Sequence, residues 1–211
     1  MFILKSVIYK DILDIDYLKI EKNKITSITG ESGSGKTTLL RLLNKMISPD
    51  GGSILFNGED IESINSVELR RKVAMLSQSP VIFEGNVRDN LLMGLKFSEK
   101  NLASDETLID ILKSIHLKKS LDENPSNFSG GEKQRLALGR IIVMNPDVFL
   151  LDEPSSALDD DTAKDVISSL CSYVKANNKT LIMISHSKAL SREFSDEIVE
   201  LKNINSEKDG K

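Results

Sequence analysis

The sequence has few of the residues that mark disulfide-rich, metal-binding or nucleic-acid-binding proteins. It contains 1 cysteine, no tryptophan and 2 histidines in 211 residues. Cys171 cannot form a disulfide within the chain, and its place in a helical pattern between apolar neighbours favours a buried core position over a redox or metal role. The net charge of -4 and the lack of a dense basic run argue against a dedicated nucleic-acid binder, so we expect no nucleic-acid partner.

Long apolar runs are also missing. The longest stretches, Val148 to Leu151 and Leu181 to Ile184, are far shorter than the roughly 20 residues that a membrane-spanning helix requires. The first ten residues carry charge early and contain no small-residue cleavage site, so we expect no signal peptide. We therefore expect the chain to act in the cytoplasm and to reach a membrane only through a partner protein.

Short apolar runs bounded by turn residues alternate with helical stretches along most of the chain. The runs that read as strands are Ile25–Thr29, Val73–Ser77, Val148–Leu151, Thr180–Ser185 and Ile198–Leu201. Such alternation is typical of parallel strands joined by crossover helices. We therefore predict an α/β fold with a mainly parallel sheet, formed by residues 1–211 as a single domain.

Two segments depart from this alternation. Residues 53–58 follow a Pro-Asp-Gly-Gly turn and predict a hairpin, which would place an antiparallel β layer near the N-terminus. From about Val81 to Asn127 helical spacing dominates, which predicts an inserted helical lobe. The expected bounds are 81–145 for the lobe and 1–80 with 146–211 for the core. The polar tail from Lys202 to Lys211 reads as a frayed end.

A glycine-rich loop, Gly-Glu-Ser-Gly-Ser-Gly-Lys-Thr, lies between the first predicted strand and an apolar helical run. Its spacing and context match a phosphate-binding loop, in which glycines let backbone N–H groups converge on the phosphates at a helix N-terminus. Lys36 would add a positive charge and Thr37 a hydroxyl ligand for Mg²⁺. An ordinary glycine turn is the alternative, but this spacing should occur by chance in only about one per cent of such chains. The predicted nucleotide contacts are Gly30, Glu31, Ser32, Gly33, Ser34, Gly35, Lys36, Thr37 and Thr38.

Two carboxylates follow the apolar strand that begins at Val148. Asp152 stands at the carboxyl edge of this strand, where the phosphate-binding loop also opens, and can bind Mg²⁺ directly or through water. Glu153 is suited to polarise the water that attacks the terminal phosphate. A solvated acidic turn before Pro154 is the alternative, which we would prefer if the phosphate-binding loop were missing.

Phe128 to Arg135, Phe-Ser-Gly-Gly-Glu-Lys-Gln-Arg, resembles the signature motif of the ATP-binding-cassette (ABC) ATPases. Ser129, Gly130 and Gly131 at the start of a helix supply N–H and hydroxyl donors for an anion. A plain helix cap with a glycine pair is the alternative. Phe128 replaces the leucine and Glu132 the glutamine of the commonest pattern, and both are tolerated variants in the family.

The resemblance implies further roles, carried over by position. Gln78 matches the glutamine that contacts Mg²⁺ and water and senses the permease. Asp159 ends Ser-Ala-Leu-Asp, which resembles the D-loop, and His186 matches the switch histidine that contacts the γ-phosphate. By this resemblance Glu153, His186, Gln78 and Lys36 form the catalytic set, and Thr37, Gln78 and Asp152 hold the metal.

Two tyrosines are candidates for the aromatic side chain that stacks on adenine. Tyr9 resembles the side chain that stacks on adenine upstream of the phosphate-binding loop, and Tyr17 is its rival for that role. Either tyrosine can instead be a half-buried strand residue. His116 lies in the predicted helical lobe between apolar neighbours, and we assign it no function.

The resemblance also implies partners. A head-to-tail homodimer would sandwich two ATP molecules with Mg²⁺, and Ser129 and Gly131 of each subunit would contact the γ-phosphate held by the other. The dimer would drive a separate membrane permease from the inner face of the cell membrane. ABC ATPases that act on DNA carry long coiled coils and those that act on ribosomes carry two cassettes, so transport is the preferred interpretation, with these and a P-loop kinase as alternatives.

The prediction of the transported substrate depends on a weaker resemblance. The segment from Ser79 to Leu91 follows Gln78 and resembles the exporter pattern. Together with the half-length chain and the signature motif, it is most similar to small bacterial ATPases paired with an iron-exporting permease of the Fet type. Phosphate or amino-acid import cassettes are the alternatives.

Overall fold

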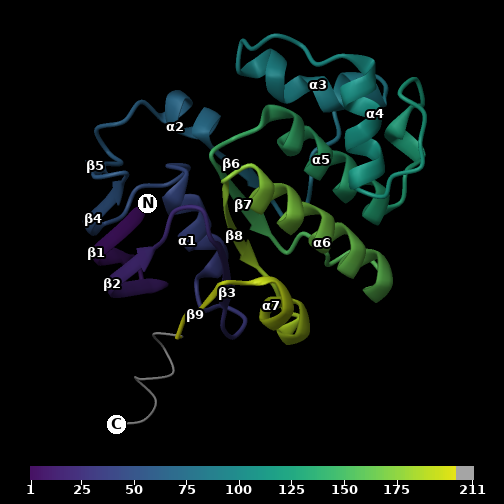
Figure 1. The fold of residues 1–211 in the computed structure, drawn as a ribbon. Coiled ribbons are helices and arrows are strands. Elements are labelled where there is room, and N and C mark those ends of the chain that lie inside the picture. The colour runs from purple at the N-terminus through teal and green to yellow at the C-terminus, as the bar shows by residue number, and fades with distance from the viewer. Residues whose placement is uncertain (203–211) are drawn as a thin grey trace.

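A five-stranded parallel sheet forms the centre of the molecule in the computed structural model, which describes residues 1–202 (Figure 1). Its strands, in spatial order, are β6 (Val73–Leu76), β7 (Val148–Asp152), β8 (Thr180–Ile184), β3 (Ile25–Thr29) and β9 (Glu197–Glu200). Each strand was predicted to within one residue at either end. Residues 203–211 of the expected frayed tail lie outside the described residues.

Both faces of this sheet are buried, and the central strand shows why its sequence is continuously apolar. Val148 and Leu150 belong to one hydrophobic core, whereas Phe149 and Leu151 belong to a second core on the opposite face. Because successive side chains of a strand point to opposite faces, a strand covered on both sides has no place for polar residues until it ends. Asp152 is the first polar side chain of β7.

A four-stranded antiparallel sheet packs near the N-terminus, as the sequence predicts. It consists, in spatial order, of β2 (Leu13–Ile20), β1 (Phe2–Tyr9), β4 (Gly51–Phe56) and β5 (Glu59–Asp60). Asn57 and Gly58 form the turn between β4 and β5, both with positive φ, of 55° and 91°. Turns with two such residues match the right-handed twist of a hairpin, and asparagine followed by glycine is a favoured pair. The predicted hairpin is therefore confirmed.

The helices cover the parallel sheet on both sides. Helix α1 (Lys36–Leu43) lies between the two sheets and fills the first core, while α6 (Asp160–Ala176) covers the other face of the parallel sheet and buries Cys171 in the second core (Figure 1). Burial raises the pKa of the Cys171 thiol, as expected for a core residue. The shorter helices α2 (Ser66–Lys72) and α7 (Lys188–Phe194) precede β6 and β9 respectively.

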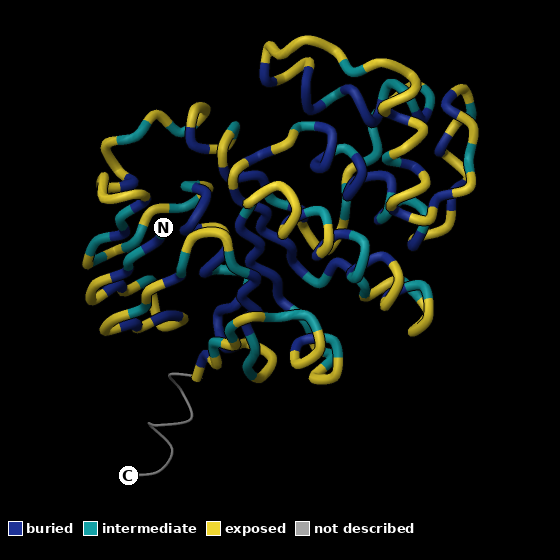
Figure 2. The backbone as a smooth tube through the Cα atoms, viewed as in Figure 1, coloured by how far each residue is buried: buried dark blue, intermediate teal, exposed yellow. Residues whose placement is uncertain are grey.

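A separate group of helices follows β6 and forms the inserted lobe. It comprises α3 (Val87–Phe97), α4 (Asp105–Ser114), the short helix η1 (Pro125–Asn127) and α5 (Gly130–Met144). Helix α5 runs back from this lobe toward β7, and its buried side chains share the second core with α3, α4 and α6. Figure 2 shows the buried segments running through the central sheet into the lobe, with exposed segments at the periphery.

The predicted fold class, a parallel core with an antiparallel layer and a helical lobe, is thus confirmed. Among the described residues, none of the helices has the length and apolar content needed to cross a bilayer.

Candidate active site

The glycine-rich loop connects β3 to α1. Gly35 caps the helix with a φ of 84°, in the left-handed region, and a Cβ atom at this position would lie 2.6 Å from Leu13 Cδ2. Only glycine fits here, because the backbone conformation and the close approach of β2 both exclude a side chain. No side chain caps the first turn of α1, so its N–H groups remain available to an anion.

The side chain of Lys36 folds back into this loop. It is 8% exposed, and its ammonium donates to the carbonyl oxygens of Gly30 at 2.9 Å and Glu31 at 2.7 Å. An ammonium has three donor hydrogens, so one remains beyond these two bonds. The loop therefore holds a positive charge together with the backbone N–H groups of the helix start, as a phosphate site requires.

A cleft of about 590 Å³ opens above this loop. Its lining residues are Ile12, Ser32, Gly33, Gly35, Lys36, Thr37, Thr38, Gln78, Glu153 and His186. The last three side chains follow the carboxyl ends of β6, β7 and β8, which meet at one edge of the parallel sheet. The fold thus brings the phosphate-binding loop together with Gln78, Glu153 and His186, all of which were predicted to be functional and are far apart in the sequence.

The carboxylate of Asp152 is hydrogen-bonded to the side chain of Thr37, which lines this cleft, although Asp152 itself is not among the lining residues. Asp152 is 3% exposed, and burial raises the pKa of its carboxyl, although a hydrogen bond from the Thr37 side chain opposes this change. Mg²⁺ prefers oxygen ligands and is commonly held by one or two carboxylates together with substrate phosphates. A carboxylate beside a hydroxyl fits that role. No cluster of three or more acidic, histidine or cysteine side chains that could bind a metal without phosphate occurs in residues 1–202.

Glu153 has an unusual backbone conformation, and both oxygens of its carboxylate are in contact with neighbouring side chains. Its backbone has a φ of 52°, in the left-handed region, a conformation that is costly for a side-chain-bearing residue and concentrates at functional sites. Gln78 Nε2 donates to Glu153 Oε2 at 2.9 Å, and His186 Nε2 lies 2.7 Å from Glu153 Oε1. The carboxylate is therefore held between the two side chains that resemblance assigned to the same site.

Gln134 also positions Glu153, although it was not among the predicted site residues. Its side chain is 1% exposed and donates to the Glu153 carbonyl oxygen at 2.8 Å, while it accepts the N–H of Ala157 at 3.3 Å. Ser156 Oγ donates to the same carbonyl at 3.0 Å. A glutamine on the buried side of α5 was the available signal, since a buried amide requires hydrogen-bond partners.

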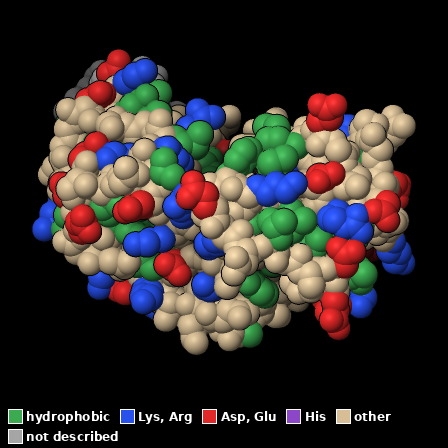
Figure 3. All heavy atoms as spheres, turned by 90° about the horizontal axis from the view of Figure 1, so that it is seen from above, with side chains coloured by type: hydrophobic (Ala, Val, Ile, Leu, Met, Phe, Trp, Pro, Cys, Tyr) green, Lys and Arg blue, Asp and Glu red, His purple; other side chains and the backbone are tan. Residues whose placement is uncertain are grey.

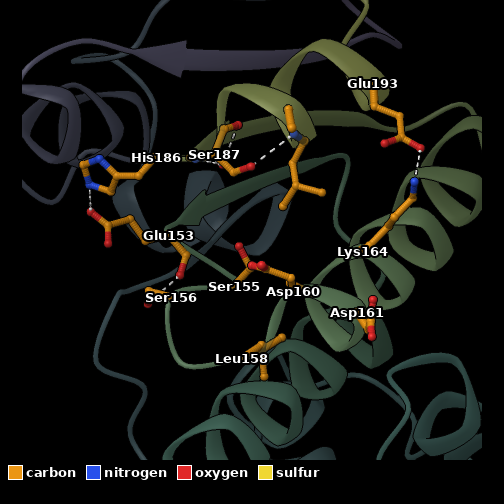
Figure 4. Close-up of a pocket in the computed structure, with 14 residues that line it drawn as sticks. Glu153, Ser155, Ser156, Leu158, Asp160, Asp161, Lys164, His186, Ser187 and Glu193 are labelled. Carbon is orange, nitrogen blue, oxygen red and sulfur yellow. Dashed lines mark hydrogen bonds and ion pairs between the residues drawn. The ribbon is translucent and has the colours of Figure 1, made fainter.

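A second cavity, of about 560 Å³, is also lined by Glu153 and His186. Figure 4 shows the two side chains pointing toward each other, and the ion pair of Lys164 with Glu193 at 2.8 Å on the opposite side. Asp159 is the N-cap of helix α6, and its carboxylate accepts the Thr162 N–H at 3.0 Å, a contact that holds the pKa of Asp159 below its ordinary value. Asp159 thus caps a helix and does not line the phosphate cleft.

The signature residues also lie outside the phosphate cleft of their own chain. Ser129 caps α5, and its hydroxyl accepts the Glu132 N–H at 3.2 Å. Gly131 packs so closely that a Cβ atom would lie 2.7 Å from the Ala157 carbonyl oxygen. None of Ser129, Gly130 and Gly131 is among the residues that line the cleft, so within the described residues one chain does not bring these donors to the phosphate-binding loop.

The structure places neither candidate tyrosine in the lining of the phosphate cleft. Tyr9 ends β1, is partly buried, and has the Lys10 ammonium 5.2 Å from its ring centroid. Tyr17 is 60% exposed. Ile12, in the turn between β1 and β2, is the residue of this region that lines the cleft, and no sequence motif marks it. His116 Nε2 lies 3.3 Å from Ser169 Oγ of α6, and His116 is not among the residues that line the cleft.

Comparisons with known proteins agree with this geometry. Residues 13–156 match the family model described as ABC transporter. The chain is 40% identical over 176 residues to the lipoprotein-releasing system ATP-binding protein LolD of Buchnera aphidicola. The aligned region covers 80% of this chain and 76% of that protein. It is 33% identical over 202 residues to the methionine import ATP-binding protein MetN 1 of Staphylococcus epidermidis, covering 92% and 59%.

A third relative, Protein STAR1 of Oryza sativa, is 39% identical over 171 residues, which are 81% of this chain and 49% of that protein. This chain therefore spans about half to three quarters of the length of these relatives.

Solved structures show the same fold. The ATP-binding cassette MJ0796, described as a dimeric post-hydrolysis state bound to ADP and Pi, has a TM-score of 0.85 and 26% identity over 96% of this chain and 95% of that one. A bacterial Atm1-family ABC exporter with ATP bound has a TM-score of 0.83 and 27% identity, covering 100% of this chain and 40% of that one. This chain therefore belongs to the ABC transporter family, in which it is the ATP-binding and ATP-hydrolysing part of a transport system.

Proposed function

We propose that this chain is the cytoplasmic ATP-hydrolysing subunit of a transporter whose permease is a separate polypeptide. The observation that carries the proposal is the phosphate cleft, where the glycine-rich loop faces Glu153, Gln78 and His186. These groups suit the hydrolysis of a terminal phosphate, which depends mainly on positioning and charge stabilisation.

Each side chain has a defined task in this proposal. The N–H groups of the loop and the Lys36 ammonium hold the phosphates of ATP. Asp152 and Thr37 would hold Mg²⁺, which neutralises charge on the phosphate oxygens, and Gln78 would contact it. Glu153 orients the attacking water and accepts its proton.

The contacts of Glu153 support a gating step. In the described structure both of its carboxylate oxygens are engaged, one by Gln78 and one by His186. A γ-phosphate in the cleft would compete for those same donors, and their release would leave the carboxylate able to accept a hydrogen bond from water. Binding of ATP would thereby prepare its own hydrolysis.

The position of the signature residues supports a head-to-tail homodimer. Ser129, Gly130 and Gly131 lie outside the phosphate cleft of their own chain, so a second copy would have to supply them. Helix N-termini attract phosphate through their unpaired N–H groups and dipole, which suits the start of α5 for this contact. Two copies arranged head to tail would close two ATP molecules between them, and Asp159 would lie at the same interface.

An apolar groove between the core and the lobe is suited to receive the permease. It has a volume of about 310 Å³ and includes Val81, Phe83 and Phe97, of which Val81 and Phe97 are 62% and 65% exposed. Arg70 and Arg140 also line it. Figure 3 shows hydrophobic side chains gathered near the middle of the face seen from above, with Lys and Arg among them. The groove contains part of the segment that follows Gln78, so a docked permease would lie close to the active site.

The cargo is the least constrained part of the proposal. Iron export, which the sequence resemblance suggests, is not a function named for the relatives described above; the names of two of them refer to lipoprotein release and methionine import. The residues that support ATP hydrolysis carry no information on cargo, because the permease would contact it. Iron export therefore stays a prediction, with phosphate or amino-acid import as its alternatives.

Affinity purification from native membranes tests the proposed role. The tagged chain is extracted in mild detergent, and its co-purifying proteins are identified by mass spectrometry beside a matched sample of Val81→Asp, Phe97→Asp. We expect an integral membrane permease with the wild-type chain and a strongly reduced amount with the variant. Ribosomes or DNA in place of a membrane protein would contradict the transport role, and the identity of the permease would test the cargo.

A further inference from the structure

Lys119 connects the loop after α4 to the signature turn, although neither the motif nor the cleft includes it. Its ammonium lies 3.2 Å from Glu132 Oε1 and 3.1 Å from Glu123 Oε1. It also lies 4.5 Å from the centroid of the Phe128 ring, within the range of a cation–π contact. Both residues at which the motif departs from its commonest form, Phe128 and Glu132, therefore contact the same cation.

Glu132 is in turn part of the cap that shapes the signature turn. Its carboxylate accepts the Ser129 N–H at 2.8 Å, while its own N–H donates to Ser129 Oγ at 3.2 Å. These reciprocal bonds form a capping box, which fixes the first turn of α5. Because Ser129 Oγ accepts this bond, its hydroxyl hydrogen remains available to donate to an anion.

The negative charge of the Glu132 carboxylate would repel a phosphate that binds next to Ser129. The Ser129 N–H, with a further contribution from Lys119, holds the pKa of Glu132 below its ordinary value, so the side chain is negatively charged at neutral pH. A phosphate that approached Ser129 would meet this like charge. A neutral glutamine could make the same bond to the Ser129 N–H without the repulsion. Glu132 thus needs a nearby cation if the turn is to receive a phosphate.

We propose that Lys119 is a positioning residue for the signature turn, which neutralises Glu132 and holds it against Ser129 so that the turn can receive the γ-phosphate of ATP bound by a second copy. This inference rests on the proposed function and names a residue on which dimer closure depends. Lys119 acts through Glu132 and does not itself touch the nucleotide. The Phe128 ring and Glu123 keep its ammonium in place.

A double-mutant cycle distinguishes this role from simple packing. The full chain carrying Glu153→Gln is the parent, and ATP-driven dimerisation is followed by sedimentation velocity, while a fluorescent ATP analogue reports binding to the monomer. Lys119→Met keeps much of the side-chain volume but removes the charge. We expect it to raise the ATP concentration for half-maximal dimerisation by about fivefold, with unchanged binding to the monomer.

The double variant, compared with Lys119→Met alone, shows whether the defect comes from the charge of Glu132. Adding Glu132→Gln to Lys119→Met removes the uncompensated charge beside Ser129 and leaves only that of Glu123, which does not bond to the signature turn, so we expect dimerisation to return to within about twofold of the parent. Lys119→Arg should also behave as the parent. Lys113→Met is the matched control, because Lys113 pairs with Asp110 on the exposed side of α4. Raising the salt to about 0.5 M should reduce the defect of the single variant, since it screens partly exposed charges.

The possible results test the role of Lys119 separately from the proposed ATPase function. Dimerisation of Lys119→Met at parental ATP concentrations would overturn the inference, as would a double variant that is as defective as the single one, because both results would deny a charge role. A parent that binds no ATP would overturn the proposed function, and this inference with it. Melting temperatures of all variants show whether any loss comes from unfolding.

Discussion

The side chain of Glu153 lies between two donors, with His186 Nε2 2.7 Å from one carboxylate oxygen and Gln78 Nε2 2.9 Å from the other. Glu153 itself has a left-handed backbone, with a φ of 52°. Because the three residues follow three different strands, this contact depends on the register of the parallel sheet. It links the residue that we expect to activate water to the two that we expect to sense ATP and Mg²⁺.

Replacement of Glu153 by glutamine should separate binding from hydrolysis. The amide preserves the shape of the side chain but cannot accept a proton from water, so we expect ATP hydrolysis to fall at least about 100-fold. ATP affinity should change little, and the protein should accumulate as an ATP-bound dimer. Phosphate release and sedimentation velocity measure the two effects. Glu106→Gln, at an exposed position in the first turn of α4, is the control. Normal hydrolysis by Glu153→Gln would remove Glu153 from this role.

Replacement of Lys36 by alanine should abolish tight nucleotide binding. The change removes the ammonium that the loop carbonyls hold beside the phosphate position, and with it a charge-assisted contact. We expect ATP affinity to fall by at least about tenfold in isothermal titration calorimetry. Lys22→Ala, at an exposed position, should bind ATP as the wild type does. Equal affinities of the two variants would contradict the assignment of the phosphate-binding loop.

The adenine contact can be tested with three alanine variants. If Tyr9 stacks on the base, Tyr9→Ala should weaken ATP binding by about fivefold or more, because stacking of a base on an aromatic ring contributes about 1–3 kcal/mol. Tyr17→Ala should have no effect. Ile12→Ala provides the third measurement, since Ile12 lines the cleft. A loss confined to Tyr17→Ala would exchange the two tyrosines, whereas a loss confined to Ile12→Ala would assign the contact to the turn between β1 and β2.

Gln134 should matter for both stability and catalysis. Gln134→Leu would leave the Ala157 N–H without its side-chain acceptor and the Glu153 carbonyl without one of its donors. A typical intramolecular hydrogen bond contributes about 0.5–1.5 kcal/mol, and the Glu153 carbonyl keeps its bond from Ser156, so we expect the free energy of unfolding to fall by about 1–2 kcal/mol. We also expect kcat to fall more than ATP affinity, because Glu153 loses a support. Urea denaturation and steady-state kinetics measure both, with Lys22→Ala, at an exposed position, as the control. An unchanged kcat would show that Gln134 supports the fold alone.

Local sequence pattern determined the strands of the parallel sheet. The apolar runs at Val148–Leu151 and Thr180–Ser185 predicted central strands because a strand buried on both faces has to be apolar throughout. The glycines before Lys36 predicted the phosphate-binding loop because few other residues permit that backbone. Asn57-Gly58 marked a hairpin for the same local reason.

Tertiary structure decided which of these groups meet. No local rule brings Gln78, Glu153 and His186 to one cleft, since each belongs to a different strand and their contact follows from strand order and register. The same holds for Gln134 and Lys119, whose partners lie in other segments of the chain. Ile12 was missed because an apolar residue in a turn gives no signal until the loop across from it is in place. The sequence by itself therefore determined the chemistry available to this protein, whereas only the fold decided which side chains are held within hydrogen-bond distance of one another.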